Sequence, residues 1–285
     1  MTLIMGVLNV TPDSFSDGGR YASTDAAIRQ GLLLHAQGAD LIDVGGESTR
    51  PGASRVSLDE EAHRVLPVVT ELARHGLRLS IDTLNAATAR SAAAAGASVI
   101  NDVSGGLADT GMAAVVADTG LTYVAMHWRA HSREMDALAH YGNVVTDVIE
   151  ELRYRVDALE AAGVKRDRIV LDPGLGFAKT SEHNWQILNQ LPSFDVLGLP
   201  IMVGASRKRF LTDVVPEGAP VSDRDLPTAV ISVLAAQAGV WAVRVHDVAA
   251  TRAALNVLAK MPPRTPRVGS ELPCGPKSPS QWNHD

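Results

Sequence analysis

Short apolar runs alternate with longer amphipathic stretches along most of this chain, and each run ends in a polar or glycine-containing turn. The runs are short and rich in β-branched residues, which predicts strands buried on both faces. The stretches between them are rich in alanine and leucine and predict helices. We expect strands at 4–8, 41–44, 79–81, 99–100, 122–126, 169–171, 201–203 and 242–245, and helices that include 25–37, 58–74, 85–95, 144–162 and 227–238.

Three of the predicted helices end alike, with small residues followed by glycine, in the segments 36–40, 94–98 and 161–164. Glycine is favoured just after a helix because it adopts the left-handed conformation without strain. The same helix ending therefore recurs along the chain.

About eight strands alternating with helices over roughly 250 residues predict a closed (β/α)8 TIM barrel, because a parallel strand needs a crossover helix to reach its neighbour. An open, doubly wound sheet is the alternative. It is disfavoured because no G-x-G-x-x-G follows the first strand, and in the segment from Gly174 to Lys179 the third glycine is missing. No phosphate-binding P-loop motif occurs either.

Composition bounds the domain organisation and the kinds of partner. A chain of 285 residues with 46% hydrophobic content fits one large α/β domain, which we place at residues 1–260. The remainder, 261–285, is rich in proline and poor in apolar residues, and predicts a flexible tail.

The single cysteine, Cys274, allows no intrachain disulfide and suggests a reducing, cytoplasmic location. No segment has the apolar length of a membrane span, and the first apolar run lacks the flanks of a signal peptide. A net charge of −6 and an aromatic content of 4% disfavour nucleic-acid binding. Small molecules are the expected partners.

Polar side chains follow every predicted strand, and the carboxyl ends of barrel strands form one mouth. Asp82, Asn101 and Asp172 come from three different strands, and Lys208 follows a fourth. Two carboxylates and an amide suit a ligand edge rich in N–H donors, such as the amino-pyrimidinone of a pterin or a guanine-like ring. The lysine adds a donor for a ring carbonyl or nitrogen.

Other polar residues have plainer interpretations. Asp13, Asp102 and Asp109 are expected to cap helices or form turns. His127, His131 and His140 show no metal-ligand spacing and are expected to be ordinary loop histidines. A transition-metal site lacks its usual histidine cluster.

The segment 201–210 joins an apolar strand to Ser206 and three adjacent cations, Arg207, Lys208 and Arg209. Phosphate sites in barrels commonly lie after the late strands, at the start of the next helix. A merely solvated helix start is the alternative, but positive charge there opposes the helix dipole. An anion site is the favoured interpretation.

Two loops, 9–19 and 45–52, are long for barrel connections and rich in glycine, proline and hydroxyl residues. Such loops can act as lids. We expect them to bring Asp17, Thr49 and Arg50 over the mouth.

Five motifs in this order resemble the dihydropteroate synthase family, over a match from about Leu3 to Lys260. They are 5–19 (MGVLNVTPDSFSDGG), 43–52 (DVGGESTRPG), 101–106 (NDVSGG), 172–179 (DPGLGFAK) and 206–208 (SRK). The resemblance implies a (β/α)8 barrel, a homodimer, Mg²⁺, and the displacement of pyrophosphate from 6-hydroxymethyl-7,8-dihydropterin diphosphate by the amine of 4-aminobenzoate.

The resemblance also implies residue roles at the matching positions. It assigns the pterin to Asp82, Asn101, Asp172 and Lys208; the diphosphate to Asn9, Arg244 and His246; the metal to Asn9; 4-aminobenzoate to Thr49, Arg50, Pro51, Phe177 and Lys208; and the chemistry to Asp17, Asp172 and Lys208. One position departs from the pattern, since Arg209 stands where many members have serine, and this leaves open which group receives the aminobenzoate carboxylate.

Two other functions stay open. A methyltransferase domain that binds methyltetrahydrofolate would share the pterin carboxylates but have no use for Ser206, Arg207 and Lys208 as an anion site. A non-catalytic pterin-binding protein would bind the ring without turnover.

Overall fold

The structure is a computed structural model that describes residues 1–11, 19–47, 56–130 and 135–261. Strands and helices alternate through these ranges. The strands are β1 (Leu3–Asn9), β2 (Leu41–Gly45), β3 (Leu79–Asp82), β4 (Val99–Asp102), β5 (Thr122–Met126), β6 (Ile169–Asp172), β7 (Met202–Val203) and β8 (Ala242–Val245). The α-helices are α1 (Gly19–Ala36), α2 (Leu58–Arg74), α3 (Ala86–Ala94), α4 (Met112–Thr119), α5 (Val144–Ala161), α6 (Ser181–Asn189), α7 (Asp225–Gln237) and α8 (Val248–Lys260). Short 3₁₀ helices are η2 (Met135–Leu138), η3 (Arg166–Arg168), η4 (Leu191–Leu197), η5 (Arg209–Val214) and η6 (Val221–Arg224).

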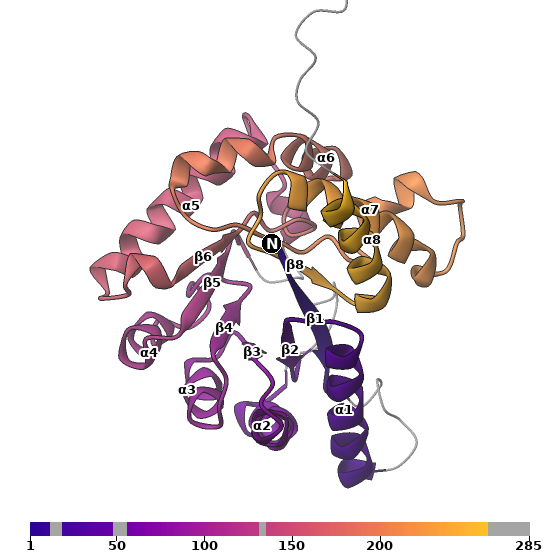
Figure 1. The fold of residues 1–285 in the computed structure, drawn as a ribbon. Helices are drawn as coiled ribbons and strands as arrows, with labels where there is room; N and C mark the ends of the chain where they lie inside the picture. Colours follow the sequence, from indigo (N-terminus) through magenta and orange to yellow (C-terminus); the bar gives the residue numbers. More distant parts are fainter. Residues whose placement is uncertain (12–18, 48–55, 131–134, 262–285) are drawn as a thin grey trace, which may run out of the picture.

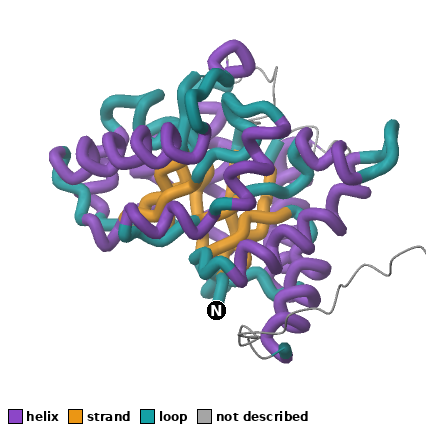
Figure 2. Tube along the Cα trace, turned by 90° about the horizontal axis from the view of Figure 1, so that it is seen from above, coloured by secondary structure: helices purple, strands orange, loops and turns teal. Residues whose placement is uncertain are grey.

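All eight strands pair in parallel, in the order β6-β5-β4-β3-β2-β1-β8-β7. The two ends of this order meet, because Leu171 of β6 forms a parallel bridge with Ile201 and its N–H donates to Pro200 O at 2.9 Å. The helices lie around the outside of the strands (Figures 1 and 2). The (β/α)8 barrel is therefore confirmed, and the open sheet is excluded.

Most predicted bounds hold to within a residue or two. The strands at 122–126 and 242–245 and the helix at 58–74 coincide with β5, β8 and α2, whereas α1 begins at Gly19, well before the predicted start at 25. The strand predicted at 201–203 loses its first residue, because Ile201 bridges to β6 and β7 begins at Met202.

The three glycine helix endings are also confirmed. Gly38, Gly96 and Gly163 have φ of +104°, +111° and +92°, a region that favours glycine. After each of them the next amide closes the helix end by reaching back five residues, as when Ala39 N donates to Leu34 O at 3.0 Å. These endings turn the chain from the helix layer back into the barrel.

The inside of the barrel is built in layers. Its lower layer is an apolar cluster of Met5, Leu41, Val99, Val124, Val170, Met202 and Ala242, with one residue from each of seven strands. Side chains alternate along a strand, so the residue two positions further on also faces inward. On β2, β4, β6 and β8 those residues are Asp43, Asn101, Asp172 and Arg244. A polar layer therefore lies directly on an apolar one.

Within the described ranges, no helix combines the length and the apolar character needed to cross a bilayer. The last helix, α8, ends at Lys260, where the predicted domain ends. The predicted tail falls almost wholly on residues 262–285, which lie outside the described residues.

Candidate active site

A cavity of about 790 Å³ lies at the carboxyl ends of the strands. It gathers the predicted site residues that the structure describes, from five strands and from the segments that follow β6, β7 and β8: Asn9, Asp82, Asn101, Asp172, Phe177, Lys208, Arg244 and His246. Asp17, Thr49, Arg50 and Pro51, which the sequence also singled out, lie outside the described residues.

Arg244 joins two acids on the cavity floor. Its Nε donates to Asp43 Oδ2 at 2.6 Å, and its Nη2 donates to Asp82 Oδ2 at 2.7 Å. Burial raises the pKa of Asp82 to about 7, although Arg244 partly opposes the shift. Burial alone would lower the pKa of Arg244, but the carboxylates of Asp43 and Asp82 raise it, so the guanidinium stays charged.

Asp43 is a residue to which the sequence assigned no role. Its side chain is fully buried, and its Oδ2 also accepts from Asn101 Nδ2 at 3.0 Å. Because an ionised carboxylate only accepts hydrogen bonds, this contact directs the Asn101 amide nitrogen toward Asp43. The Asn101 oxygen is then available as an acceptor beside Asp82. In the sequence it stood as the first residue of the motif 43–52, at an inward position of a buried strand.

Asp172 and Lys208 line the same cavity, near Arg244. Asp172 Oδ1 accepts from Gly174 N at 2.7 Å, and burial raises the pKa of this carboxyl while the nearby Lys208 opposes the shift. Burial likewise lowers the pKa of Lys208 to about 8, against the attraction of Asp172. Lys208 Nζ donates to Leu175 O and lies 4.8 Å from the centre of the Phe177 ring. A cationic donor thus stands between a carboxylate and an aromatic face.

The three cations after β7, Arg207, Lys208 and Arg209, differ in their surroundings. Arg207 has the left-handed φ of +59°, and its Nε and Nη2 each lie 2.7 Å from an oxygen of Asp225. All three line the cavity, but Arg209 is exposed, whereas Lys208 lies close enough to Asp172 for that carboxylate to raise its pKa against the effect of burial. The hydroxyl of Ser206, the first residue of the expected anion site, lies 2.9 Å from His246 Nδ1, and both residues line the cavity together with Arg244.

A second network under the loop after β6 was also missed. His127 was expected to be an ordinary loop histidine, yet it is 3% exposed at the end of β5. Its Nε2 lies 2.9 Å from Glu151 Oε2, and its Nδ1 lies 2.9 Å from the Nζ of Lys179, which is also buried. Since the carboxylate accepts, Nε2 carries the proton and Nδ1 accepts from the lysine. Burial, aided by Lys179, lowers the pKa of His127 to about 4.

The histidine was misjudged because its burial depends on α5, which brings Glu151 against the end of β5. His140 is exposed, as expected of a loop histidine, and His131 lies outside the described residues.

The predicted turn and cap residues behave as expected where they are described. Asp102 accepts from Ser104 N at 2.7 Å and Gly106 N at 2.8 Å, which forms the turn after β4. Asp109 Oδ2 accepts from Ala86 N at 2.9 Å at the start of α3. Both carboxylates therefore accept hydrogen bonds from backbone N–H groups. Asp13 lies outside the described residues.

No group of three or more histidine, cysteine or acidic side chains suited to a metal occurs in the part of the chain that the structure describes. Asn9 offers an amide oxygen at the cavity wall. Magnesium usually keeps several waters and takes few protein ligands together with substrate phosphates. One amide oxygen is compatible with that kind of site.

The chain is similar to known proteins of one family. The model of the family described as pterin binding enzyme matches residues 5–246. A dihydropteroate synthase of Mycobacterium leprae is 50% identical over 96% of this chain and 95% of its own length, and one of Bacillus subtilis is 44% identical over 87% and 84%. A Xanthomonas albilineans dihydropteroate synthase structure with 4-aminobenzoic acid superposes with a TM-score of 0.84 at 43% identity, covering 91% of this chain and 92% of that one.

We predict that the imidazole of His127 titrates near pH 4, well below the ordinary 6.5. Between these values the unfolded chain binds the additional proton, so this histidine stabilises the fold fully above pH 6.5. The contribution, of about 3 kcal/mol, is lost as the pH falls toward 4. An NMR titration of the ring nitrogens measures the value directly, and an inflection near 6.5 would contradict the buried network.

Proposed function

The chain belongs to the pterin binding enzyme family, among its dihydropteroate synthases, and from this premise we propose how the cavity residues divide the reaction. The enzyme is a transferase of folate biosynthesis that joins 6-hydroxymethyl-7,8-dihydropterin diphosphate and 4-aminobenzoate, giving 7,8-dihydropteroate and pyrophosphate. The observation that carries the assignment of roles is the convergence of Asp82, Asn101, Asp172 and Lys208 on one cavity.

The pterin ring is proposed to lie on the polar floor. Asp82, Asn101 and Asp172 supply acceptors for the amino and ring N–H groups, and Lys208 supplies a donor for the ring carbonyl or nitrogen. The contact from Asp43 supports this assignment, because it leaves the Asn101 oxygen directed away from that acid. A buried, pre-oriented set of this kind loses little freedom when a ligand binds.

The diphosphate is proposed to lie beside Asn9, Arg244 and His246. Enzymes of this family use a divalent metal ion, and we propose magnesium, held by the Asn9 amide oxygen together with the phosphates. When bound, the ion would offset negative charge on the leaving pyrophosphate. Arg244 is charged and already points into the cavity from its contacts with the two acids, which supports its role toward the same anion.

The arylamine is proposed to pack on Phe177, with Lys208 beside the ring. Thr49, Arg50 and Pro51 complete this subsite by resemblance, as Asp17 does near the reacting carbon. The candidate receptors for the aminobenzoate carboxylate are Lys208 and Arg209, which both line the cavity, Arg209 at an exposed position.

The proposed chemistry needs little proton transfer. The C–O bond to the diphosphate breaks first, and the electron pair leaves with pyrophosphate. Asp82 and Asp172 stabilise the positive charge left on the pterin, while Arg244 and His246 stabilise the anion. The amine nitrogen then bonds to the exocyclic carbon and loses a proton.

The turnover test is pyrophosphate release. We expect release only when both the pterin diphosphate and 4-aminobenzoate are present, and we expect Asp172→Asn to lower turnover on the order of a hundredfold, because one stabilising charge is removed. The exposed Asp167→Asn on η3 is the matched control and should retain wild-type turnover.

Near-normal turnover of Asp172→Asn would refute the proposed pterin site. A methyltetrahydrofolate-dependent methyltransferase or a non-catalytic pterin-binding protein would release no pyrophosphate under any of these conditions.

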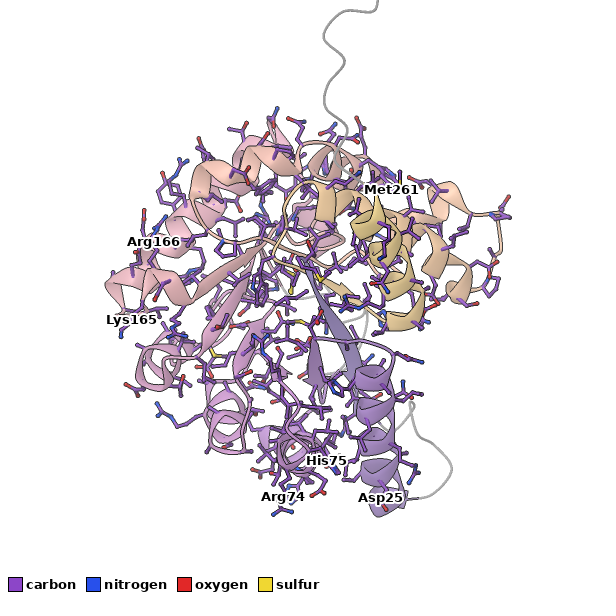
Figure 3. All side chains as sticks on the ribbon, viewed as in Figure 1. Asp25, Arg74, His75, Lys165, Arg166 and Met261 are labelled. Carbon is purple, nitrogen blue, oxygen red and sulfur yellow. The ribbon has the colours of Figure 1, made fainter. Side chains whose placement is uncertain are left out.

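We also propose that the enzyme is a homodimer, through an apolar face of α7 and α8. Leu226, Val230 and Leu234 recur every fourth residue on α7 and are 73%, 53% and 57% exposed. Val257 of α8 is 60% exposed, and Met261, just beyond its end, is 58% exposed (Figure 3). α7 and α8 pack together, and exposed apolar stripes of this kind are typical of interfaces. A second copy is the occupant that the resemblance implies.

The mass in solution tests the dimer. We expect light scattering to give twice the 30.1 kDa chain mass for the wild type, and the chain mass for Leu226→Glu combined with Leu234→Glu, because charges would be buried against their copies. Leu58→Glu on α2, where the leucine is 51% exposed, should stay dimeric. A monomeric wild type, or a charged variant that stays dimeric, would refute this interface.

A further inference from the structure

The loop after β6 folds back over its own lysine. Lys179 is 4% exposed, and its Nζ lies 3.1 Å from Phe177 O and 2.9 Å from His127 Nδ1. Ala178 between them has a φ of +47°, a conformation uncommon for a residue with a side chain. This turn lets the lysine return beneath the residue that carries the aromatic ring.

Three other side chains, from outside this loop, form hydrogen bonds to its backbone. Lys208 donates to Leu175 O, and Asn184 Oδ1 accepts from Gly176 N at 2.7 Å. The Tyr141 hydroxyl donates to Ala178 O at 2.9 Å. Lys179 is thus the donor to the carbonyl of Phe177 itself, while other contacts hold the neighbouring peptides.

The lysine is oriented from outside the barrel. His127 accepts from Lys179 only while its other nitrogen donates to Glu151, and that carboxylate is also bound by Arg129, whose Nε lies 3.1 Å away. Burial alone would raise the pKa of Glu151, but hydrogen bonds from His127 and Arg129 lower it to about 2. The acid therefore stays an acceptor and keeps the histidine in one tautomer.

We propose that Lys179, oriented by His127, is a positioning residue that fixes the Phe177 wall of the arylamine subsite. The inference rests on the proposed function, which assigns Phe177 to 4-aminobenzoate. If Lys179 served only to balance the charge of Asp172, its removal would weaken binding of the pterin instead, because Asp172 is assigned to that substrate. The two roles differ in which substrate is affected when the lysine is removed.

The first test is Lys179→Met, which keeps an unbranched side chain but removes the donor. We expect KM for 4-aminobenzoate to rise on the order of tenfold and KM for the pterin diphosphate to stay within about threefold, since small misplacement at a subsite is costly. Lys165→Met, at an exposed site before η3, is the control (Figure 3). Unchanged KM values, or a parallel rise of both, would overturn the proposal.

A double-mutant cycle tests whether Lys179 acts through Phe177. In a Phe177→Ala background, Lys179→Met should change KM for 4-aminobenzoate by less than about twofold, because the ring that the lysine positions is absent. An undiminished effect would show that the lysine acts elsewhere. If Lys179→Met does not fold, His127→Phe removes the acceptor that orients the lysine, and the same pattern is expected.

Hydrogen exchange gives a readout independent of activity. The amides of residues 174–178 should exchange faster in Lys179→Met and His127→Phe than in the wild type and Lys165→Met. Equal protection in all four proteins would overturn the inference. Absence of turnover in the wild type would instead contradict the proposed function, so the two failures are distinguishable.

Discussion

Alternation of side chains along eight parallel strands is the constraint on which the site depends. Inward positions repeat every second residue, and the barrel is narrow enough for side chains to fill it in layers. Met5, Leu41, Val170 and Ala242 belong to an apolar layer that closes the bottom of the barrel. The next inward residues of β2, β4, β6 and β8 are polar, and the cavity lies on their side of the apolar layer, at the carboxyl ends of the strands.

The polar layer is held together by charge. Arg244 spans Asp43 and Asp82, and Lys208 stands near Asp172, so each acid on the floor has a cation close by. Removing one member of such a buried set leaves an uncompensated charge, which is strongly destabilising. The same contacts hold the floor in position before substrate arrives. Asp43 is an example: it is fully buried, it pairs with Arg244, and it also holds the Asn101 amide in one orientation.

The sequence was most informative where local pattern decides structure. The bounds of β5, β8 and α2 follow from apolar periodicity and from turn and cap residues, and the residues at strand ends could be placed at one mouth because parallel strands share a direction. The co-location of Asp82, Asp172 and Lys208 was predictable for that reason.

Contacts between distant side chains were not predictable. The pairing of Asp43 with Arg244 depends on the register of β1 with both β2 and β8, and it joins residues 201 positions apart. The burial of His127 depends on how α5 packs against β5, and the return of Lys179 depends on the left-handed turn at Ala178. No periodicity in the sequence encodes these features. The roles of individual site residues, the magnesium ion, the dimer and the cytoplasmic location stay predictions.

The assignment of the polar cavity floor to the pterin can be tested by a crystal structure of the enzyme with the pterin diphosphate and Mg²⁺. We expect the amino-pyrimidinone edge to lie within hydrogen-bond distance of Asp82, Asn101 and Asp172, with Lys208 at the ring and the diphosphate beside His246. A ring bound elsewhere, with those four side chains free of ligand contacts, would contradict it.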